Sequence, residues 1–301
     1  MKKFAYAVDD ETGWIVADER DRRAHPSVMA NYLWWPQGFY VQEPTGAGHF
    51  VEMLRRFPRL IAFPWLHTRT AASFHRAPIL GETIYASADI TDKYVRRDKE
   101  HVVIKATYTD PRGYLLAEYE HTCMIRSRVK LEAKPQSAET TTASTPDTPV
   151  SHATRFPARG VGRGRGDWET IEPIHVTLTL ANARLFSLPL ESFHTHDSLA
   201  KEAGFPKAVP QGLMSFGYLS GLCTDYFGEQ WCVSGTLAVK FINMLYRDDR
   251  LTIGGRVADV DPLSDTTVRV HLDLFVDDDT GRRVTAGTAS GVLDRSTDPC
   301  P

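Results

Sequence analysis

The chain of 301 residues exceeds the usual size of a single domain, so we expect two domains of ordinary size. Hydrophobic residues make up 42% and charged residues 24%, a balance typical of a globular enzyme and unlike that of a disordered or fibrous chain. The net charge of −3 favours neither a nucleic acid nor a membrane surface as a partner. The N-terminus lacks the apolar core of a signal peptide, and no apolar run approaches the roughly 20 residues of a membrane helix. The four scattered cysteines form neither a metal motif nor a disulfide framework, so we expect a cytoplasmic protein.

The first half, residues 1–129, predicts one helix followed by an antiparallel meander. Apolar residues recur at helical spacing after the helix-start signal Thr45-Gly46. Apolar residues then alternate as they do in strands, and the turn Asp110-Pro111-Arg112-Gly113 carries the Asp and Gly that tight hairpins favour. The expected elements are a helix at 50–57 and strands at 84–90, 102–108 and 115–125.

Residues 130–153 predict a linker between the halves. The segment is rich in Thr, Ser, Ala and Pro, and without apolar periodicity it cannot bury enough surface to order itself. The glycine- and arginine-rich run at 160–166 is similar to a phosphate-binding loop, but it lacks the Lys-Ser/Thr pair of a P-loop. We interpret this run as the flexible end of the linker.

The second half, residues 154–301, repeats the order of the first. Met214, Tyr218 and Leu222 recur at helical spacing, with small residues among them that let a sheet approach the helix closely. Strands are expected at 244–251, 268–276 and 284–293. One helix wrapped by a curved antiparallel sheet in each half is an α+β arrangement.

The densest run of chemically active side chains is residues 191–197, Glu-Ser-Phe-His-Thr-His-Asp. Asp197 or Ser198 can cap a short helix ending near Gly204, which would leave the two histidines of the run in the loop before it. The longer helix is then entered near Gly212. A glycine there lets a ligand carbonyl approach the backbone, where N–H groups at the helix start are free to donate.

This run resembles the MaoC-like hydratase family of hotdog-fold proteins, whose members add water to, or remove it from, acyl thioesters. His194, Ala200, Gly204-Phe205 and Gly212 match the family pattern position by position, while His196 and Gln211 stand where the family has Asp and His. Further likeness lies in residues 67–83 and 227–241. The resemblance covers nearly the whole chain except the linker. It implies a double hotdog in which the N-terminal domain holds the acyl tail and the C-terminal domain carries the chemistry.

One departure from the family pattern concerns the catalytic Asp expected five residues before the His, where this chain has Pro189. The Asn usually found closer to the His is also missing, with Glu191 and Ser192 in that stretch. Three interpretations stay open. Glu191 substitutes from a shifted position, or the reaction needs only a His and an oxyanion hole, or catalysis has been lost.

The resemblance implies hydration of an enoyl thioester, or the reverse dehydration of a 3-hydroxyacyl thioester, as in fatty acid or polyketide metabolism. In this hypothesis the Gly212 amide donates to the thioester carbonyl and stabilises the negative charge that develops there, and His194 and Glu191 move the protons. His196, Gln211 and Ser215 are expected to contact the substrate. No metal or redox cofactor is needed, because coenzyme A or the phosphopantetheine of an acyl carrier protein is part of the substrate.

Other functions remain open on the same fold. They are a tailoring isomerase or cyclase, a non-catalytic acyl-binding protein and, with less support, a thioesterase. A metal site on His194, His196 and Asp197 is not favoured, because the sequence shows no further cluster of ligands. The sequence does not decide between coenzyme A and a carrier protein, nor whether two chains pair.

Overall fold

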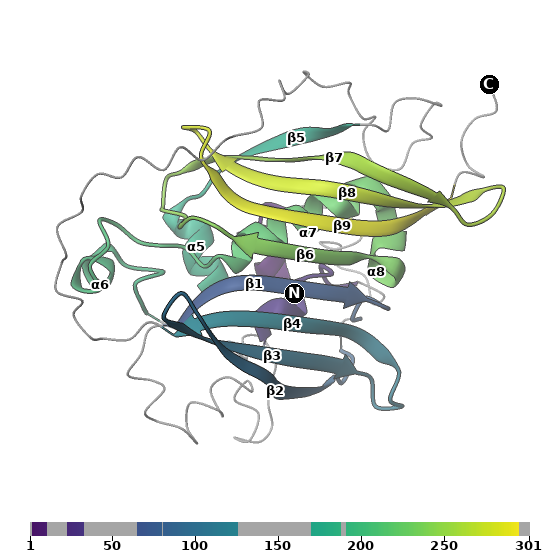
Figure 1. The fold of residues 1–301 in the computed structure, drawn as a ribbon, viewed down its shortest axis with the longest axis horizontal. Helices are drawn as coiled ribbons and strands as arrows, with labels where there is room; N and C mark the ends of the chain where they lie inside the picture. Colours follow the sequence, from purple (N-terminus) through teal and green to yellow (C-terminus); the bar gives the residue numbers. More distant parts are fainter. Residues whose placement is uncertain are drawn as a thin grey trace.

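The computed structural model describes residues 2–10, 23–32, 65–79, 81–125, 170–187 and 191–294. They form an α+β structure in which one long antiparallel sheet carries a central helix (Figure 1). The linker predicted at 130–153, the helix predicted at 50–57 and the run at 160–166 lie outside the described residues, as does Pro189.

The two halves contribute helices and strands in chain order. The first half provides α1 (Lys2–Ala7), α3 (Val28–Tyr32), β1 (Trp65–Phe74), β2 (Tyr85–Arg96), β3 (Lys99–Thr109) and β4 (Leu115–Ile125). The second provides β5 (Thr170–Thr177), α5 (Leu180–Ser187), α6 (Asp197–Glu202), α7 (Leu213–Phe227), η3 (Gly228–Gln230), α8 (Trp231–Ser234), β6 (Thr236–Phe241), β7 (Arg250–Pro262), β8 (Thr267–Asp278) and β9 (Arg283–Asp294). No helix among these is both long and apolar enough to cross a membrane.

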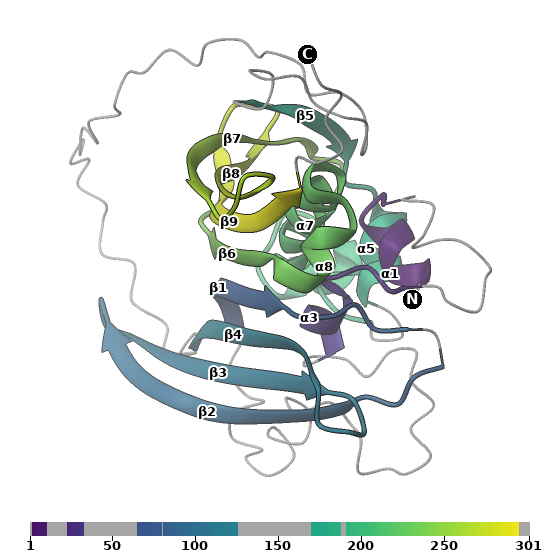
Figure 2. The ribbon, with the colours of Figure 1, turned by 90° about the vertical axis from the view of Figure 1, so that its right-hand side faces the viewer.

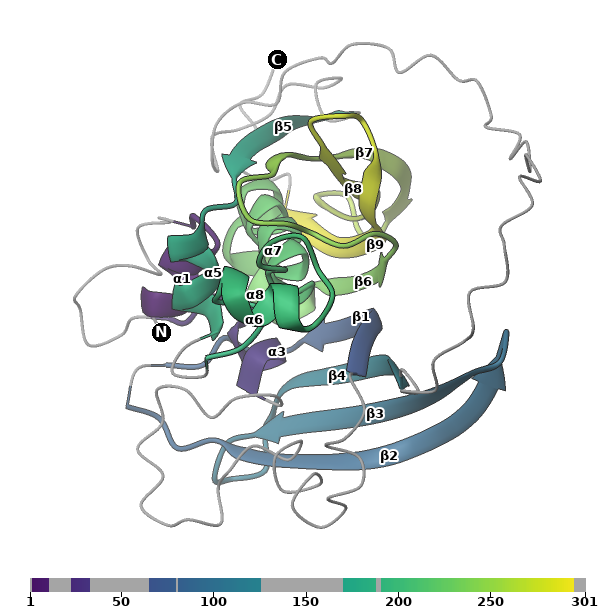
Figure 3. The ribbon, with the colours of Figure 1, turned by 90° about the vertical axis from the view of Figure 1, so that its left-hand side faces the viewer.

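The nine strands follow the order β2-β3-β4-β1-β6-β9-β8-β7-β5. The halves join where β1 pairs antiparallel with β6, in a register from Arg69 opposite Lys240 to Ser73 opposite Thr236. Figures 2 and 3 show the helices α1, α5, α7 and α8 together on one side of this sheet. Because backbone hydrogen bonds cross the join, the two halves share one continuous sheet.

Both predicted meanders are present, β2 to β4 in the first half and β7 to β9 in the second; β4 has the predicted bounds, and β2, β3, β8 and β9 are longer than expected. The strand predicted at 244–251 is wrong in its position, because β7 begins only at Arg250. Asp248 has a φ of 68°, and the carboxylate of Asp249 accepts a hydrogen bond of 2.7 Å from the amide of Tyr246. This turn chemistry holds the segment before Arg250 out of the sheet.

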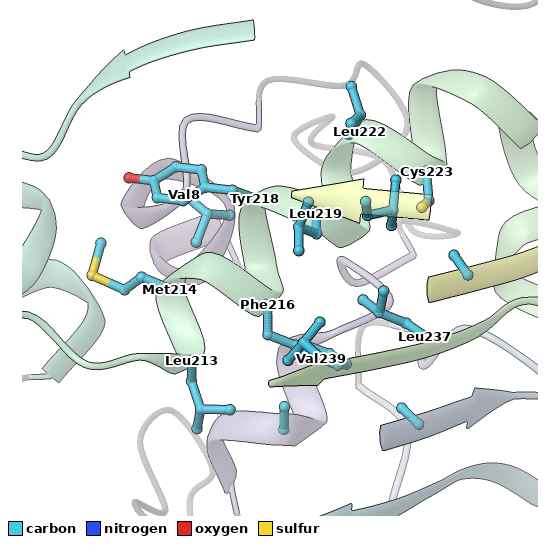
Figure 4. Packing of buried hydrophobic residues seen from close by; sticks show 14 of the residues in the cluster. Val8, Leu213, Met214, Phe216, Tyr218, Leu219, Leu222, Cys223, Leu237 and Val239 are labelled. Carbon is cyan, nitrogen blue, oxygen red and sulfur yellow. The ribbon is translucent and has the colours of Figure 1, made fainter. Parts of the chain in front are cut away.

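Helix α7 is almost entirely buried between the sheet and the N-terminal segment. Leu237 and Val239 of β6 join Phe216 of α7 in the hydrophobic core (Figure 4). On another side of α7, a Cβ added at Gly217 would lie 2.7 Å from Cγ1 of Val8, so only glycine lets the chain after α1 pack this closely. The small residues noted in the sequence therefore admit the N-terminal segment as well as the sheet.

A buried histidine–carboxylate contact joins two N-terminal segments beside α7. Nε2 of His25 lies 3.2 Å from Oδ2 of Asp10, and both side chains are almost fully enclosed. The amide N–H of Ser27 donates to Nδ1 of His25 over 3.1 Å, so the ring proton sits on Nε2 and faces the carboxylate. Because both side chains are almost fully enclosed, we interpret this contact as one that stabilises the packing of the two segments.

Candidate active site

His194 lies in a tight turn before α6, as the sequence predicted. The turn is closed by Ser192 and Thr195: the amide of Thr195 donates to the carbonyl of Ser192 over 2.9 Å, and the amide of Ser192 donates to Oγ1 of Thr195 over 3.0 Å. The helix cap differs from the prediction. His196 is the capping residue and makes no side-chain cap bond, and the carboxylate of Asp197 is bound by Ala208 and Arg247.

A hydrogen bond fixes the tautomer of the His194 ring. Nδ1 lies 2.6 Å from the carbonyl oxygen of Val209, which can only accept, so Nδ1 carries the proton. The amide of Val209 in turn donates to the carbonyl of Phe193 over 3.0 Å, which holds the two segments together. Nε2 of His194 is therefore the nitrogen with a free lone pair, in the form a general base requires.

The protein around His194 also sets its charge. Burial lowers the pKa of His194 to about 4, and the bond to Val209 acts in the opposite direction with a smaller effect. The ring is therefore neutral near pH 7. It can take a proton during a reaction and give it up readily.

Asp197 holds this loop to the rest of the domain. Its carboxylate accepts bonds of 2.8 Å from Nε of Arg247 and 2.8 Å from the amide of Ala208. The bond from Arg247, followed by that from Ala208, lowers the pKa of Asp197 to about 2. Asp197 is thus a structural anion, and across the described part of the chain no three His, Cys, Asp or Glu side chains gather as metal ligands.

Gly212 stands at the start of α7, where it was expected. A Cβ there would lie 3.3 Å from Cδ1 of Phe241 in β6, tighter than ordinary packing. Within the described residues the Gly212 amide donates to no backbone carbonyl, in keeping with its position at a helix start. Since Val209 closely precedes Gly212 and binds His194, this hydrogen bond ties the His194 loop to the segment that leads into α7.

The other predicted site residues have different surroundings. Gln211 is buried and donates from its side-chain amide to Oγ of Ser187 at the end of α5 over 2.9 Å. Ser215 is fully buried in the first turn of α7, and its hydroxyl has no hydrogen-bond partner in the described structure. The side chain of Glu191 is 74% exposed, and its carboxylate lies 4.0 Å from Nε2 of His196. Substrate contacts by Gln211, Ser215 and His196, and a proton-transfer role for Glu191, stay predictions.

The structure adds a histidine that the sequence did not single out as a site residue. His67 of β1 has its ring centroid 5.8 Å from that of Phe241, the ring that also borders Gly212. Burial, and next the positive charge that His194 would carry, lower the pKa of His67 to about 3. His67 fell within a stretch of family likeness, but only the pairing of β1 with β6 brings it here, and no local pattern signals that pairing.

A cavity of about 490 Å³ lies on the other face of the sheet. Thr236, Leu237 and Ala238 of β6 line this cavity, and the side chains of Thr236 and Ala238 alternate with those of Leu237 and Val239, which lie in the hydrophobic core with α7. None of the site residues described above borders the cavity. It is separate from the His194 region.

Residues 167–275 match the family model described as the MaoC like domain. This part of the chain is similar to a MaoC-like domain. The match starts before β5 and ends within β8, so it contains the His194 loop and all of α7. No curated protein sequence matches the chain.

Solved structures match nearly the whole chain at low sequence identity. A MaoC-like dehydratase superposes with a TM-score of 0.67 at 16% identity, covering 98% of this chain and 93% of that one. A MaoC-like dehydratase from Phytophthora capsici gives 0.60 at 15% identity, with 97% and 91% covered. A conserved hypothetical protein of Mycobacterium tuberculosis with a double hotdog fold gives 0.56 at 12% identity, with 96% and 90% covered. The fold is therefore the predicted double hotdog.

Proposed function

We propose that this protein is a hydratase or dehydratase acting on an enoyl or 3-hydroxyacyl thioester. The observation that carries the proposal is the His194 ring, neutral and fixed with Nε2 available, beside the start of α7 at Gly212. A base and a backbone amide that can donate to the thioester oxygen are the two elements that addition of water next to a thioester requires. The match to the MaoC-like domain supports the same reaction.

In the hydration direction, Nε2 of His194 takes a proton from water while the water oxygen bonds to C3 of the enoyl group. Negative charge moves onto the thioester oxygen, where the Gly212 amide and the helix start stabilise it. The same proton then passes from His194 to C2. One water is consumed, His194 returns to its neutral form, and dehydration follows these steps in reverse.

This proton cycle needs a single basic residue, His194. It therefore does not require Glu191, whose side chain is mostly exposed. A carboxylate that is mostly exposed and next to His196 is poorly placed to share a water with His194. Of the three interpretations that follow from Pro189, the geometry favours a reaction run by a histidine and an oxyanion hole.

A tailoring isomerase or cyclase is the second candidate function. It is favoured by the replacement of the family Asp by Pro189, because a site with one base can move a proton without adding water. Coenzyme A or carrier-protein delivery of the thioester, a cytoplasmic location and pairing of two chains stay predictions.

One assay tests the function. The purified protein is incubated with a panel of enoyl- and 3-hydroxyacyl-coenzyme A thioesters in water enriched in heavy oxygen, and the products are read by mass spectrometry. Uptake of labelled oxygen into the acyl chain supports hydration. A rearrangement of unchanged mass supports the isomerase or cyclase, release of a labelled free acid indicates a thioesterase, and absence of any product across the panel contradicts the proposal.

A further inference from the structure

Among the described residues of the first half, His67 lies close to the region where α7 begins. Strand β1 is hydrogen-bonded to β6 through Arg69 opposite Lys240, which sets the start of β1 beside the end of β6. Phe241 ends β6, and its ring lies 5.8 Å from that of His67. The same ring passes within 3.3 Å of a Cβ position on Gly212, so His67 and Gly212 are separated by no more than this one aromatic side chain.

The charge state of this region restricts what His67 can do. The pKa values of His67 and His194 are lowered to about 3 and about 4, the first in part by repulsion from the second. Near pH 7 both rings are neutral, and when His194 takes up a proton His67 does not compete for it. A nitrogen of a neutral imidazole can donate to a water molecule or accept from it, so one ring nitrogen of His67 is enough to hold a water.

A further layer of side chains holds the His67 ring in place. The His121 ring of β4 contacts the His67 ring, with centroids 5.1 Å apart. Nδ1 of His121 is in turn 3.1 Å from the hydroxyl of Thr70. The Tyr119 ring stacks on His121 at 5.8 Å with an interplanar angle of 3°. His67 is therefore held by the sheet, whereas His194 is held by its loop.

We propose that His67 holds the water molecule from which His194 takes the proton, so that the active site is completed by a side chain from the N-terminal hotdog. This inference rests on the proposed function. His67 would do the water-holding part of the work that the absent carboxylate at Pro189 does in the family pattern. The proton balance is unchanged: His67 hydrogen-bonds the water and stays neutral, and His194 carries the proton from the water oxygen to C2.

The first test replaces His67 in the full-length protein by Phe and by Gln. Phe keeps a ring of similar size without hydrogen-bonding groups, so kcat for hydration should fall about 10²-fold because the water is no longer oriented. The KM for the thioester should change little, since Gly212 and not His67 holds the carbonyl. Gln can donate to a water and accept from it, so His67→Gln should recover much of the lost rate.

The matched control is His101→Phe on β3, where the imidazole stacks on Tyr94 at 4.9 Å. This variant makes the same chemical change in the same half and should keep the activity of the unmodified protein. If His67→Phe is as active as this control, the inference is overturned while the proposed function stands. If His67→Gln and His67→Phe lower kcat by the same factor, a hydrogen-bonding role for His67 is also excluded.

A second readout does not depend on turnover. In nitrogen-15 NMR spectra of the imidazole rings, His67→Phe should shift the Nε2 signal of His194, because the water between the two rings is lost, whereas His101→Phe should leave that signal in place. A protein inert toward the whole thioester panel would contradict the proposed function, and the His194 signal would still decide whether His67 and His194 share a water. An unmoved signal overturns the inference.

Discussion

The loop that carries His194 and the strand that carries His67 bring their histidines to one site by different physical means. His194 is fixed by hydrogen bonds to Val209, and its loop is tied down by the ion pair of Asp197 with Arg247. His67 is fixed by its place in the sheet and by ring contacts with Phe241 and His121. The hydrogen bonds of the loop fix the position of one atom, Nε2 of His194. The pairing of strands in the sheet determines only which side chains surround His67.

Because the two histidines are held differently, substitutions in the two regions should have different effects on the reaction rate. Changes to the loop alter the reacting nitrogen or its support and should appear in the rate of the reaction. Changes to the exposed groups beside the loop should leave the rate almost intact. The following predictions separate these cases.

Substitution of His194 by Ala should have the largest effect. It removes the only base in the proposed proton cycle, so the hydration rate should fall about 10²–10⁴-fold. The fold should persist, because the ring is half-buried and contributes one hydrogen bond to Val209. Steady-state kinetics with the best thioester substrate and a thermal melt check both parts of the prediction.

The matched control is His175→Ala on β5, where the imidazole bonds to the hydroxyl of Thr252 over 3.1 Å, away from the site. Full activity is expected for this variant. An active His194→Ala protein would place the chemistry elsewhere and remove the basis of the proposed function.

Gly212→Val should lower turnover next most strongly. The added Cβ already lies 3.3 Å from the ring of Phe241, and its branches would occupy the space in which the thioester oxygen approaches the amide. Loss of one oxyanion donor typically lowers kcat by about 10²–10³-fold, so a loss in this range is expected. Gly212→Ala, which adds only the Cβ, should lose less, and a fully active Gly212→Val enzyme would exclude the helix-start amide from the mechanism.

Much of the structure around the His194 loop could be predicted from the sequence, because the signals for it are local. The short helix after the two histidines, the glycine at the start of α7 and the spacing from His194 to Gly212 all lie within one stretch of chain. The meanders were predictable for the same reason, since alternation and Asp-Gly turns report on neighbouring residues. The strand start at Arg250 was missed because the acidic turn before it competes with the apolar residues Met244 and Leu245.

The position of His67 in the sheet could not be predicted in this way. His67 reaches the site only because β1 pairs with β6 of the other half, and neither strand was recognised from its alternation. The exposure of Glu191 could not be predicted either, because a carboxylate three residues before His194 can point toward the ring or away from it. Sequence spacing fixes how far apart two residues are along the chain, and side-chain direction depends on the turn that Ser192 and Thr195 close.

Asp197→Asn should have a moderate effect, seen mainly in stability at acid pH. The pKa of Asp197 is lowered from 3.8 to about 2 by Arg247, so its charged form stabilises the fold fully above about pH 3.8. That contribution is lost as the pH falls toward 2. The difference in melting temperature between the unmodified protein and Asp197→Asn should therefore shrink over this window.

The control for Asp197 is Asp273→Asn, which breaks the exposed ion pair with Arg256 at 2.8 Å and should leave the reaction rate unchanged. Asp197→Asn should lower the rate, because the loop that presents His194 is less firmly held. Equal rates in the two variants would mean that the ion pair with Arg247 does not support the site.

Glu191→Gln should have the smallest effect, and its result decides between the loop's two candidate proton carriers. If Glu191 had taken over from the absent family Asp, the change would remove a proton-transfer group and lower the rate about 10²–10⁴-fold with substrate binding retained. The carboxylate is instead 74% exposed and lies 4.0 Å from His196, so we expect near-full activity beside an inactive His194→Ala protein. A large loss would show that the loop rearranges when the thioester binds and brings Glu191 to the reacting water. In that case the double variant Glu191→Gln with His194→Ala should be little worse than the worse single variant, because residues that act as a unit are not additive.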